Sequence, residues 1–562
     1  MVSISLPQAL QTALAFERAG MGTSAESMYR QILAADPNQP EVWRRLGLIA
    51  VSAGRHAEAV QFFSQAIALS PENAVYYCDM GVAYRRIGQL EKAVEYYRAG
   101  LARQEDFAGL HINLCEALCQ LRRFDEAIAG YRRVLELTPD HAPTLCDLGV
   151  MLSQRGEWDD AIAHFRRATA IDPQLSQAPN NLGWALTQLE RYDEAIAVLT
   201  SALGRFPGTA GIYKNLGNAL FRSGRFTEAE RCYRDWVARH PLDGTAHRSL
   251  GHVLLCLGQF AEGWREFEWR QADVDFSEEH RSFSVPRWDG RPIPGGTLLL
   301  HAEQGFGDAL NFARYLPYAC ERSAARRVLV ECPRALERLM RQSYGTPVEF
   351  TIYQQGLDPG PQSFDCYASA ISLPYLLGMD EPLAMREPYL QLDPEWRIPW
   401  RERLGPFTGL RVGIAWAGNA THVNDWRRSI ATHLLLPLLT RHPEIHFYSL
   451  QLERPHDEVE SLRAAGLIDL TGHITDFADT AAFVSELDLV ISVDTAVVHL
   501  AGALGRPVWT LLPLAPDWRW GVGREDTPWY PTMRLFRQKR AGDWGEVIQR
   551  VDEALAAPAA AT

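Results

Sequence analysis

The sequence predicts a long array of paired helices followed by two α/β lobes, and three observations lead to this prediction. Small, aromatic and proline residues recur with a period of 34 residues through the first half of the chain. From residue 297 onward, short apolar stretches alternate with amphipathic ones, as in strands followed by helices. That alternation stops in a segment rich in proline and tryptophan, at about 380–407, and then starts again.

The repeat of the first half has fixed positions. A small residue lies ten positions after each proline, a second small residue twelve positions later, and a large residue four positions after that. The prolines are Pro37, Pro71, Pro139, Pro173, Pro207 and Pro241. The first small residues are Gly47, Gly81, Cys115, Gly149, Gly183, Gly217 and Gly251. The large residues are Phe63, Tyr97, Tyr131, Phe165, Leu199, Tyr233 and Phe267.

Each unit is therefore expected to be two helices joined by a turn. The small residues lie where the two helices approach closely, and the large residue fills the layer between neighbouring units. Proline ends the second helix because it cannot continue a hydrogen-bonded helix. This is the tetratricopeptide repeat. We expect a solenoid of about seven to eight repeats over residues 1–280, with the pattern out of phase after Gly263.

Arrays of this kind bury a core only by stacking, and they curve into a superhelix with a concave face that commonly holds a peptide or a protein. The residue two positions before each first small residue is polar in all seven units. From this column we select Asn113, Asn181 and Asn215 as candidates for hydrogen bonds to an extended peptide. Ordinary solvated helix positions are the alternative interpretation.

The charge of the chain narrows the possible partners. The formal net charge is −13 and the pI is near 5.7, whereas general nucleic-acid binding needs a basic surface. We therefore expect no nucleic-acid partner. Lysine occurs only as Lys92, Lys214 and Lys539, so we expect arginine to hold any phosphate group.

The cysteines and the apolar segments indicate the cellular compartment in which the protein is expected. The nine cysteines form no CxxC pair, and Cys115 and Cys119, four apart on a predicted helix, lack further metal ligands. We expect buried, reduced cysteines and a cytoplasmic protein. No apolar run approaches 20 residues, and the N-terminus has no basic segment before an apolar one, so we expect no membrane span and no signal peptide.

The second half is expected to form an N-terminal lobe over 281–395 and a C-terminal lobe over 408–562. Strands followed by helices predict parallel sheets with helices on both faces. Two such lobes place a cleft at the carboxyl ends of their strands, where ligands bind in open α/β sheets. In the first lobe the expected strands begin near 297, 327, 348 and 364, and in the second they lie within 411–418, 445–452, 467–472, 487–493 and 508–513.

Three segments place polar residues at this predicted cleft. In the first, a strand ends at Val493, and Asp494 and Thr495 open a helix that carries His499. The N-terminus of a helix offers free N–H groups and the positive end of the helix dipole, which suits a diphosphate. The alternative is that Asp494 only caps the helix and His499 only packs.

The second segment follows the strand near 411. Gly418 and Asn419 form a small-residue turn, and a polar loop with Arg427, Arg428 and Ser429 comes next. Paired arginines at the end of a strand are suited to clamp a phosphate, although a solvated basic loop is the alternative. Because 445–452 is expected to be the neighbouring strand, we add Gln451 to the donor-binding candidates.

The third segment belongs to the first lobe. Gln304, Gly305 and Gly307 lie in a loop that glycine allows to approach a ligand closely. Asp308 is expected at the start of the following helix, facing the cleft. A carboxylate there is able to accept the proton of an acceptor hydroxyl, and a simple helix cap is the alternative.

Residues 297–555 resemble the bacterial ADP-heptose heptosyltransferases, which have the GT-B fold of two Rossmann-like lobes. The matching residues are Gly307 and Asp308, and Asp494 and Thr495 with His499. The resemblance implies that Asp308 is the catalytic base and that the second motif holds the donor diphosphate and sugar. Two departures, Ala496 in place of the family's glycine and arginine in place of its phosphate-binding lysine, mean that the donor need not be ADP-heptose.

The whole layout is similar to that of bacterial tetratricopeptide glycosyltransferases. The matching elements are the EQGxGD, NDxxRS and DTxxxHLAGALGxPVW segments and a final part with Trp518-Arg519-Trp520, Pro528–Pro531 and Leu535–Gln538. The order of domains also resembles that of the O-GlcNAc transferases, which present an asparagine ladder to protein substrates; this is a likeness of layout alone.

The expected function is therefore transfer of a sugar from a nucleotide-sugar donor to an acceptor hydroxyl, without a metal or another cofactor. The acceptor would be a protein held by the repeats, such as flagellin or another surface protein. One alternative is a scaffold whose transferase lobes are degenerate, and another is a transferase for glycans or lipid-linked sugars. The sequence does not name the donor, the acceptor, the stereochemistry or the oligomeric state, and an oligomer is compatible with it.

Overall fold

The computed structural model describes residues 5–273, 283–303, 305–353, 364–419, 425–452 and 456–557. Contacts between residues divide the chain into two compact units, Met1–Ile212 and Tyr213–Thr562. In the described ranges, no helix combines the length and the apolar character that a membrane span requires. The two units are considered in turn.

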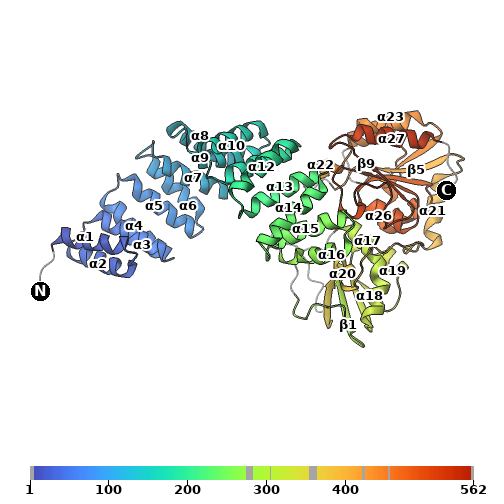
Figure 1. The fold of residues 1–562 in the computed structure, drawn as a ribbon, viewed down its shortest axis with the longest axis horizontal. Coiled ribbons are helices and arrows are strands. Elements are labelled where there is room, and N and C mark those ends of the chain that lie inside the picture. Colours follow the sequence, from blue (N-terminus) through green and yellow to red (C-terminus); the bar gives the residue numbers. More distant parts are fainter. Residues whose placement is uncertain are drawn as a thin grey trace. The chain divides into compact units, whose positions relative to one another are not determined.

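The first unit is a series of helix pairs, one pair for each predicted repeat (Figure 1). Its helices are α1 (Leu6–Arg18), α2 (Gly22–Ala35), α3 (Pro40–Ser52), α4 (His56–Leu69), α5 (Ala74–Arg86), α6 (Leu90–Leu101), α7 (Ala108–Gln120), α8 (Phe124–Leu137), α9 (Ala142–Gln154), α10 (Trp158–Ile171), α11 (Gln177–Gln188) and α12 (Tyr192–Arg205). The repeat prolines fall just after the second helix of each pair, as predicted.

Where the first small residue is Gly47, Gly81, Gly149, Gly183 or Gly217, the large residue of the same repeat packs onto it. A Cβ atom on Gly47 would lie 2.3 Å from Cε1 of Phe63, and a Cβ on Gly183 would lie 2.3 Å from Cγ of Leu199. Phe63 also shares a buried cluster with Met80 of the next repeat, so the large residue fills the layer between units as well. Glycine is needed on the first helix because the second helix places a large side chain directly against it.

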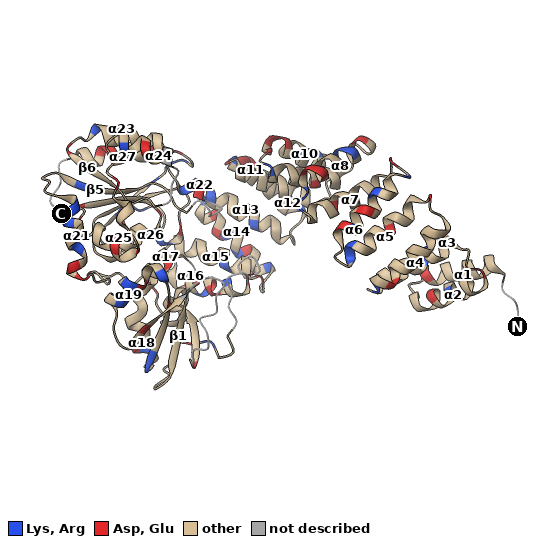
Figure 2. Cartoon of the chain, turned by 180° about the vertical axis from the view of Figure 1, so that it is seen from behind, with Lys and Arg blue, Asp and Glu red and all other residues tan. Residues whose placement is uncertain are grey.

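Acidic and basic residues are mixed along the repeat helices (Figure 2). Many form ion pairs from one repeat to the next. Arg98 contacts Glu126 at 2.6 Å, and Arg166 contacts Glu194 at 2.8 Å. These pairs are largely exposed, so each adds at most about 1 kcal/mol, and the buried side chains supply most of the stability.

The second unit starts with the end of the repeat array and continues into two parallel sheets (Figure 1). Helix α13 (Ala210–Arg222) begins at the unit boundary, and α14 (Phe226–Arg239), α15 (Gly244–Cys256), α16 (Phe260–Phe267) and the 3-10 helix η1 (Glu268–Ala272) follow. The repeat pattern is lost because α16 is shortened and η1 replaces its last turns.

The N-terminal lobe has a four-stranded parallel sheet in the order β3-β2-β1-β4. Its strands are β1 (Thr297–His301), β2 (Arg327–Pro333), β3 (Val348–Tyr353) and β4 (Cys366–Ser369). Its helices are α17 (Phe306–Phe312), α18 (Leu316–Ser323), α19 (Glu337–Ser343) and α20 (Leu373–Leu376), with 3-10 turns η3 (Ala313–Tyr315), η4 (Arg334–Leu336) and η5 (Ala370–Ser372).

The C-terminal lobe has a five-stranded parallel sheet in the order β6-β5-β7-β8-β9. Its strands are β5 (Leu410–Ala415), β6 (Ile445–Ser449), β7 (Leu489–Val493), β8 (Val508–Leu512) and β9 (Met533–Arg537). Its helices are α21 (Ile398–Leu404), α22 (Asp425–Arg428), α23 (Thr432–Arg441), α24 (His456–Ala464), α25 (Phe477–Val484), α26 (Ala496–Ala503) and α27 (Trp544–Ala556), with 3-10 turns η6 (Pro394–Arg397), η7 (Thr471–His473) and η8 (Trp518–Trp520).

Two details of this lobe differ from the sequence prediction. The expected strand at 467–472 is wrong: only Ile468 forms a β-bridge, to Tyr448, because Asp469 turns the chain by accepting the Thr471 N–H and the Thr471 hydroxyl. Strand β9 was not predicted. Its buried alternate residues Met533 and Leu535 lie in a segment that we had interpreted only as a motif.

The apolar cores fix how the lobes meet. Helices α23, α24 and α27 cover one face of the five-stranded sheet, and the other face, with α25 and α26, belongs to a larger core. That larger core continues without a break into the N-terminal lobe and into α15 and α16 of the last repeat. The two lobes and the last repeat therefore form one packed body.

Within this core, Arg314 joins the N-terminal lobe to the segment near 380–407 and to the C-terminal lobe. Its guanidinium, fully buried, donates to the carbonyl oxygens of Trp529 at 2.7 Å and Leu383 at 3.1 Å, and to the Tyr389 hydroxyl at 3.2 Å. It also lies 4.5 Å from the ring centre of Tyr530. Among the described residues it pairs with no carboxylate, so carbonyl dipoles and aromatic rings carry its charge.

The contact between Gly183 and Leu199 generates a stability prediction. Gly183→Ala should destabilise the repeat array by about 1–3 kcal/mol, because the added methyl group overlaps a buried side chain. Gly204→Ala is the matched control: nothing lies within 4 Å of its Cβ position, so it should be neutral or stabilising by up to about 1 kcal/mol. Calorimetric melting of the full chain measures both, and equal melting temperatures for the two variants would contradict the packing.

Candidate active site

Asp308 stands at the start of α17, where the chain leaves β1. Its Oδ2 accepts the backbone N–H of Gly305 at 3.2 Å, so it does cap the helix. Gly307 lies against His499 of α26: a Cβ there would be 2.9 Å from the imidazole Cδ2. Glycine at 307 therefore allows the two lobes to approach at this point. Gln304 lies outside the described residues.

Arg519 of η8 links Asp308 to the other lobe. Its Nη2 donates to Oδ1 of Asp308, and its Nη1 donates to Oδ1 of Asp517 at 2.8 Å. The guanidinium is 7% exposed and stacks 4.1 Å from the Trp518 ring centre. Burial raises the pKa of Asp308 and Arg519 opposes this, whereas Arg519 outweighs burial and lowers the pKa of Asp517.

Asp494 follows β7 directly, at the carboxyl edge of the five-stranded sheet of the C-terminal lobe. The helix cap beside it is Thr495, whose hydroxyl accepts the Val497 N–H at 3.3 Å, so Thr495 and not Asp494 caps α26. No described residue forms an ion pair with Asp494. Burial, and then the negative charge of Asp517, raises the pKa of Asp494 to about 6.

His499 is part of the core beneath this site. Its Nδ1 is hydrogen-bonded to the Tyr530 hydroxyl at 3.0 Å, and its ring stacks on Trp520 at 5.2 Å. Burial lowers the pKa of His499 well below its usual range, so the imidazole is neutral. Its position favours the packing alternative over direct contact with a ligand.

The donor-side loop is held over the end of β5. A Cβ on Gly418 would lie 2.3 Å from Asp425 and 2.4 Å from Arg428, so these side chains are seated directly on the glycine. Arg428 pairs with Asp425 at 3.1 Å, and its Nη1 donates to the Asp494 carbonyl at 3.4 Å. Ser429 accepts the Gly418 N–H at 3.2 Å and donates to Asp425 at 2.8 Å. Arg428 is thereby fixed beside Asp494.

The remaining candidates have other surroundings. Gln451 accepts the N–H groups of Trp416 at 3.1 Å and Ala417 at 2.9 Å, so its amide shapes the end of β5. Arg427 lies 4.6 Å from the ring centre of the exposed Trp426. Asn419 is exposed and follows Gly418.

The three asparagines of the proposed peptide groove lie on the first helices of their repeats. Asn113 lies on α7 and its amide donates to Cys78 Sγ of the preceding repeat at 3.3 Å. Asn181 on α11 and Asn215 on α13 are partly exposed.

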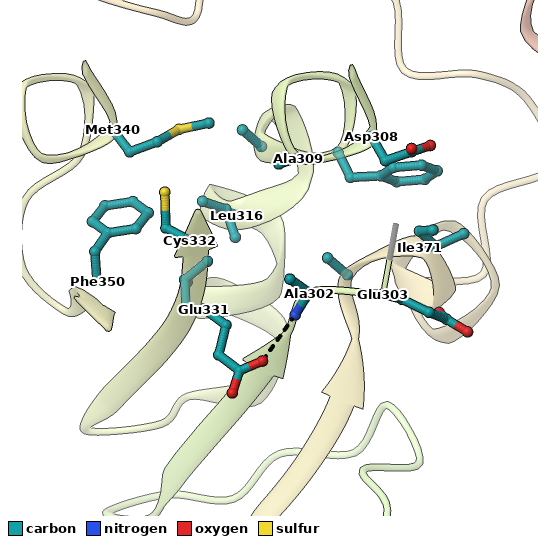
Figure 3. Close-up of a pocket in the computed structure, with 14 residues that line it drawn as sticks. Ala302, Glu303, Asp308, Ala309, Leu316, Glu331, Cys332, Met340, Phe350 and Ile371 are labelled. Atoms are coloured by element: carbon teal, nitrogen blue, oxygen red, sulfur yellow. Dashed lines mark hydrogen bonds between the residues drawn. The ribbon is translucent and has the colours of Figure 1, made fainter. Parts of the chain in front are cut away.

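A small pocket opens beside Asp308 in the N-terminal lobe (Figure 3). Its walls are apolar and include Leu316, Met340 and Phe350. Asp308 and Glu303 lie at one side of it, away from Phe350 and Met340 (Figure 3). The pocket offers an apolar contact next to a carboxylate.

Sequence reasoning missed Arg519 and Asp517 as site residues. Arg519 stands in the Trp518-Arg519-Trp520 segment, which we had used only as a mark of resemblance. The arginine between two tryptophans was an available signal, because a guanidinium in such surroundings is buried and needs a carboxylate partner. That the partner would be Asp308, 211 residues away, required the fold.

Comparisons with known proteins agree with this description. Tetratricopeptide-repeat family models match 106–174; 10–74 with 146–210; and 50–108 with 186–251. The family model described as glycosyltransferase family 9 (heptosyltransferase) matches 451–538, a part of the C-terminal lobe from the end of β6 to β9.

Protein FlbA of Caulobacter vibrioides is 31% identical over 320 residues, which make up 52% of this chain and 52% of FlbA. The chain thus spans about half the length of this curated relative.

Solved repeat proteins are similar over the array. MamA is 21% identical and covers 28% of this chain and 93% of its own, with a TM-score of 0.27. YrrB, described as a TPR protein with an unusual peptide-binding site, is 19% identical over 32% of this chain and 91% of its own, with a TM-score of 0.28. PilW, described as a type IV pilus biogenesis factor, is 19% identical over 38% and 98%, with a TM-score of 0.34.

The chain thus matches tetratricopeptide-repeat models in its first half and the glycosyltransferase family 9 model in its C-terminal lobe, in the order that the sequence predicts. The predicted fold class, a helical repeat solenoid followed by two α/β lobes with parallel sheets, is confirmed.

The environment of Asp494 generates a pH prediction. Because its pKa is raised from 3.8 to about 6 in the folded protein, the folded state binds a proton more tightly than the unfolded chain, and stability falls as pH rises through this interval. Asp494→Asn should therefore raise stability by about 1–2 kcal/mol above pH 6, allowing for partial exposure. The gain should vanish near pH 4.

Melting temperatures from pH 4 to pH 8 measure this effect. Asp380→Asn, at an exposed aspartate that forms no ion pair with the described residues, is the control and should leave the profile unchanged. A gain for Asp494→Asn that is constant across the pH range would contradict the assignment.

Proposed function

We propose that this protein is a cytoplasmic, metal-independent glycosyltransferase that moves a sugar from a nucleotide-sugar donor to a hydroxyl group of an acceptor. The observation that carries the proposal is that Asp308 of one lobe and Asp494 of the other both interact with a single buried arginine, Arg519, while Arg428 donates to the Asp494 carbonyl. A base and an anion-binding group from opposite lobes thus meet at the carboxyl ends of two parallel sheets. The nine unpaired cysteines support a reducing compartment.

In this proposal the donor diphosphate lies against Arg428, the Thr495 hydroxyl and the first N–H groups of α26. The arginine and the helix dipole stabilise the negative charge that develops on the leaving nucleoside diphosphate. This is the charge that a divalent cation neutralises in other transferases, so the proposal requires no metal. Asp494 is placed to hydrogen-bond the sugar or the diphosphate.

Asp308 accepts the proton of the acceptor hydroxyl as its oxygen attacks the sugar carbon and the bond from that carbon to the diphosphate breaks. The raised pKa of Asp308 suits a base, because a stronger base accepts a proton more readily. Arg519 holds the carboxylate in place until the acceptor arrives. The apolar pocket beside Asp308 accommodates a nonpolar part of the acceptor, and the repeats are proposed to hold a protein that carries it.

Nucleotide binding tests the donor site. A thermal-shift screen of UDP, GDP, ADP, CMP and their sugars should show stabilisation by one nucleotide, by about 2.7 kcal/mol at a hundredfold excess over its dissociation constant. Arg428→Gln should abolish the shift, because it removes the cation nearest Asp494. Arg441→Gln, which breaks an arginine–aspartate pair between α23 and α27, should retain it. No shift with any nucleotide would favour a non-catalytic scaffold.

Asp308→Asn tests the base. Transfer, or hydrolysis of the bound nucleotide sugar, should fall by about 10²–10⁴-fold while the nucleotide still binds, since only proton transfer is lost. Asp543→Asn is the control: Asp543 also caps a helix, by accepting the Glu546 N–H at 3.1 Å, but lies outside the cleft residues, so turnover should stay near wild type. EDTA should not lower the wild-type rate. An equal loss in both variants would assign Asp308 to capping alone.

A further inference from the structure

The last helical turn of the repeat array carries an arginine with unusual surroundings. Arg270 in η1 is fully buried, and its Nε and Nη2 donate to the two carboxylate oxygens of Glu303 at 3.1 Å and 2.7 Å. Such a two-point bond fixes orientation as well as distance. Burial acts to raise the pKa of Glu303, but Arg270 outweighs it and holds the pKa below its usual range. The pair is therefore ionised.

This pair ties the end of the array to the site. Glu303 lies two residues after β1, at the start of the turn that leads to Asp308. Ser369, at the end of β4, donates to Glu303, and the Ser372 hydroxyl accepts from Arg270 at 2.8 Å. One guanidinium thus joins η1 to the carboxyl ends of two neighbouring strands.

A second contact links the same part of the array to Arg519. Trp264 of α16 meets Trp518 edge to face, with ring centres 5.0 Å apart. Trp518 is the residue on which Arg519 stacks. Both partners of the bond between Asp308 and Arg519 are therefore set against the last repeat, one through Glu303 and one through Trp518.

Stability alone does not account for the Arg270 pair. Removing two charges from water costs several kcal/mol per ion, so a buried ion pair contributes little net stability compared with apolar packing. Elsewhere in the array, arginine–glutamate pairs remain on the surface. Arg234 and Glu262 form a two-point bond at 2.7 Å, with side chains 39% and 32% exposed. The buried Arg270–Glu303 pair differs from the Arg234–Glu262 pair because one of its members, Glu303, lies next to the segment that leads to Asp308.

We propose that Arg270 is a positioning residue: it fixes the turn between β1 and α17, and through it the carboxylate of Asp308 relative to Arg519. The last repeat is thus a working part of the transferase site, rather than only the end of an adaptor for partners. The effect on turnover rests on the proposed function, whereas the effect on the turn itself does not.

The first test is kinetic and uses the full chain. Arg270→Gln should lower hydrolysis of the nucleotide sugar identified by thermal shift by about tenfold to a hundredfold, because a small displacement of a catalytic group has effects of this size. The dissociation constant of the nucleotide should change by less than about twofold, since its site lies in the other lobe. Arg270→Lys, which keeps the charge but loses the two-point bond, should be intermediate, and Arg234→Gln should match wild type.

The second test does not depend on turnover. In hydrogen exchange of the same variants, the amides of 306–312 should exchange at least about tenfold faster in Arg270→Gln than in wild type or Arg234→Gln, while those of β2 keep their protection. If Arg270→Gln fails to fold, Arg270→Gln combined with Glu303→Gln replaces it in both tests. Glu268, the other carboxylate bonded to Arg270, keeps its bond to Arg287, so the double variant leaves no buried unpaired charge.

Unchanged exchange in 306–312 overturns the proposal, and so does an equal increase throughout the N-terminal lobe, which would mark a purely structural role. Unchanged turnover in a folded variant overturns it as well. If the wild-type protein neither binds nor hydrolyses any nucleotide sugar, the proposed function fails, and the exchange data still decide whether Arg270 positions the turn.

Discussion

The structure depends on placing one buried guanidinium, Arg519, among the carboxylates of Asp308, Asp517 and Asp494. A guanidinium removed from water must be paired and hydrogen-bonded, and a carboxylate in the same environment must be paired or protonated. Asp308 and Asp517 bond directly to Arg519, whereas Asp494 forms no ion pair with the described residues, and its pKa is raised to about 6. The one carboxylate without a cationic partner is therefore the one at the donor-side helix, where a ligand that brings hydrogen bonds of its own would complete its surroundings.

Such a cluster keeps its geometry only in a rigid frame, because its energy changes steeply with distance in a dry site. Arg314 supplies part of that frame by bonding carbonyl groups of the linker and of the C-terminal lobe. Tyr530 supplies another part: its hydroxyl accepts from Asn311 at 3.0 Å and is bonded to His499. These groups lie under the site and not in it. They fix the position of one sheet relative to the other, so that residues from both lobes reach the same point.

The repeats, the two lobes and the order of the segments with candidate site residues could be predicted from the sequence. Each of these features depends on local periodicity or on a strand followed by a helix. The sequence was insufficient wherever a residue acts through a distant partner. The expected strand at 467–472 failed because Asp469 turns the chain, and β9 went unrecognised in a segment with few β-branched residues. His499 was expected to face the ligand, and only the fold shows that Tyr530 and Trp520 enclose it. The bonds of Arg270 to Glu303 and of Arg519 to Asp308 join residues 33 and 211 positions apart, so no local pattern predicts them.

The loss of the repeat pattern after Gly263 has a physical cause at the junction. In earlier repeats the glycine of the first helix faces a large side chain, as Gly183 faces Leu199. In the last repeat a Cβ on Gly251 would lie 2.5 Å from the backbone nitrogen of Phe267, and one on Gly244 would lie 2.5 Å from the backbone of Ala272. In the last repeat, the main chain of α16 and η1 thus occupies the space that a large side chain fills in earlier repeats. This close approach is possible only because the residues on the first helix are glycines. This closer approach places η1 under the N-terminal lobe, where Arg270 reaches Glu303. The positions that no longer match the repeat are therefore those that face a sheet instead of another helix pair, and the array ends by becoming part of the domain that follows it.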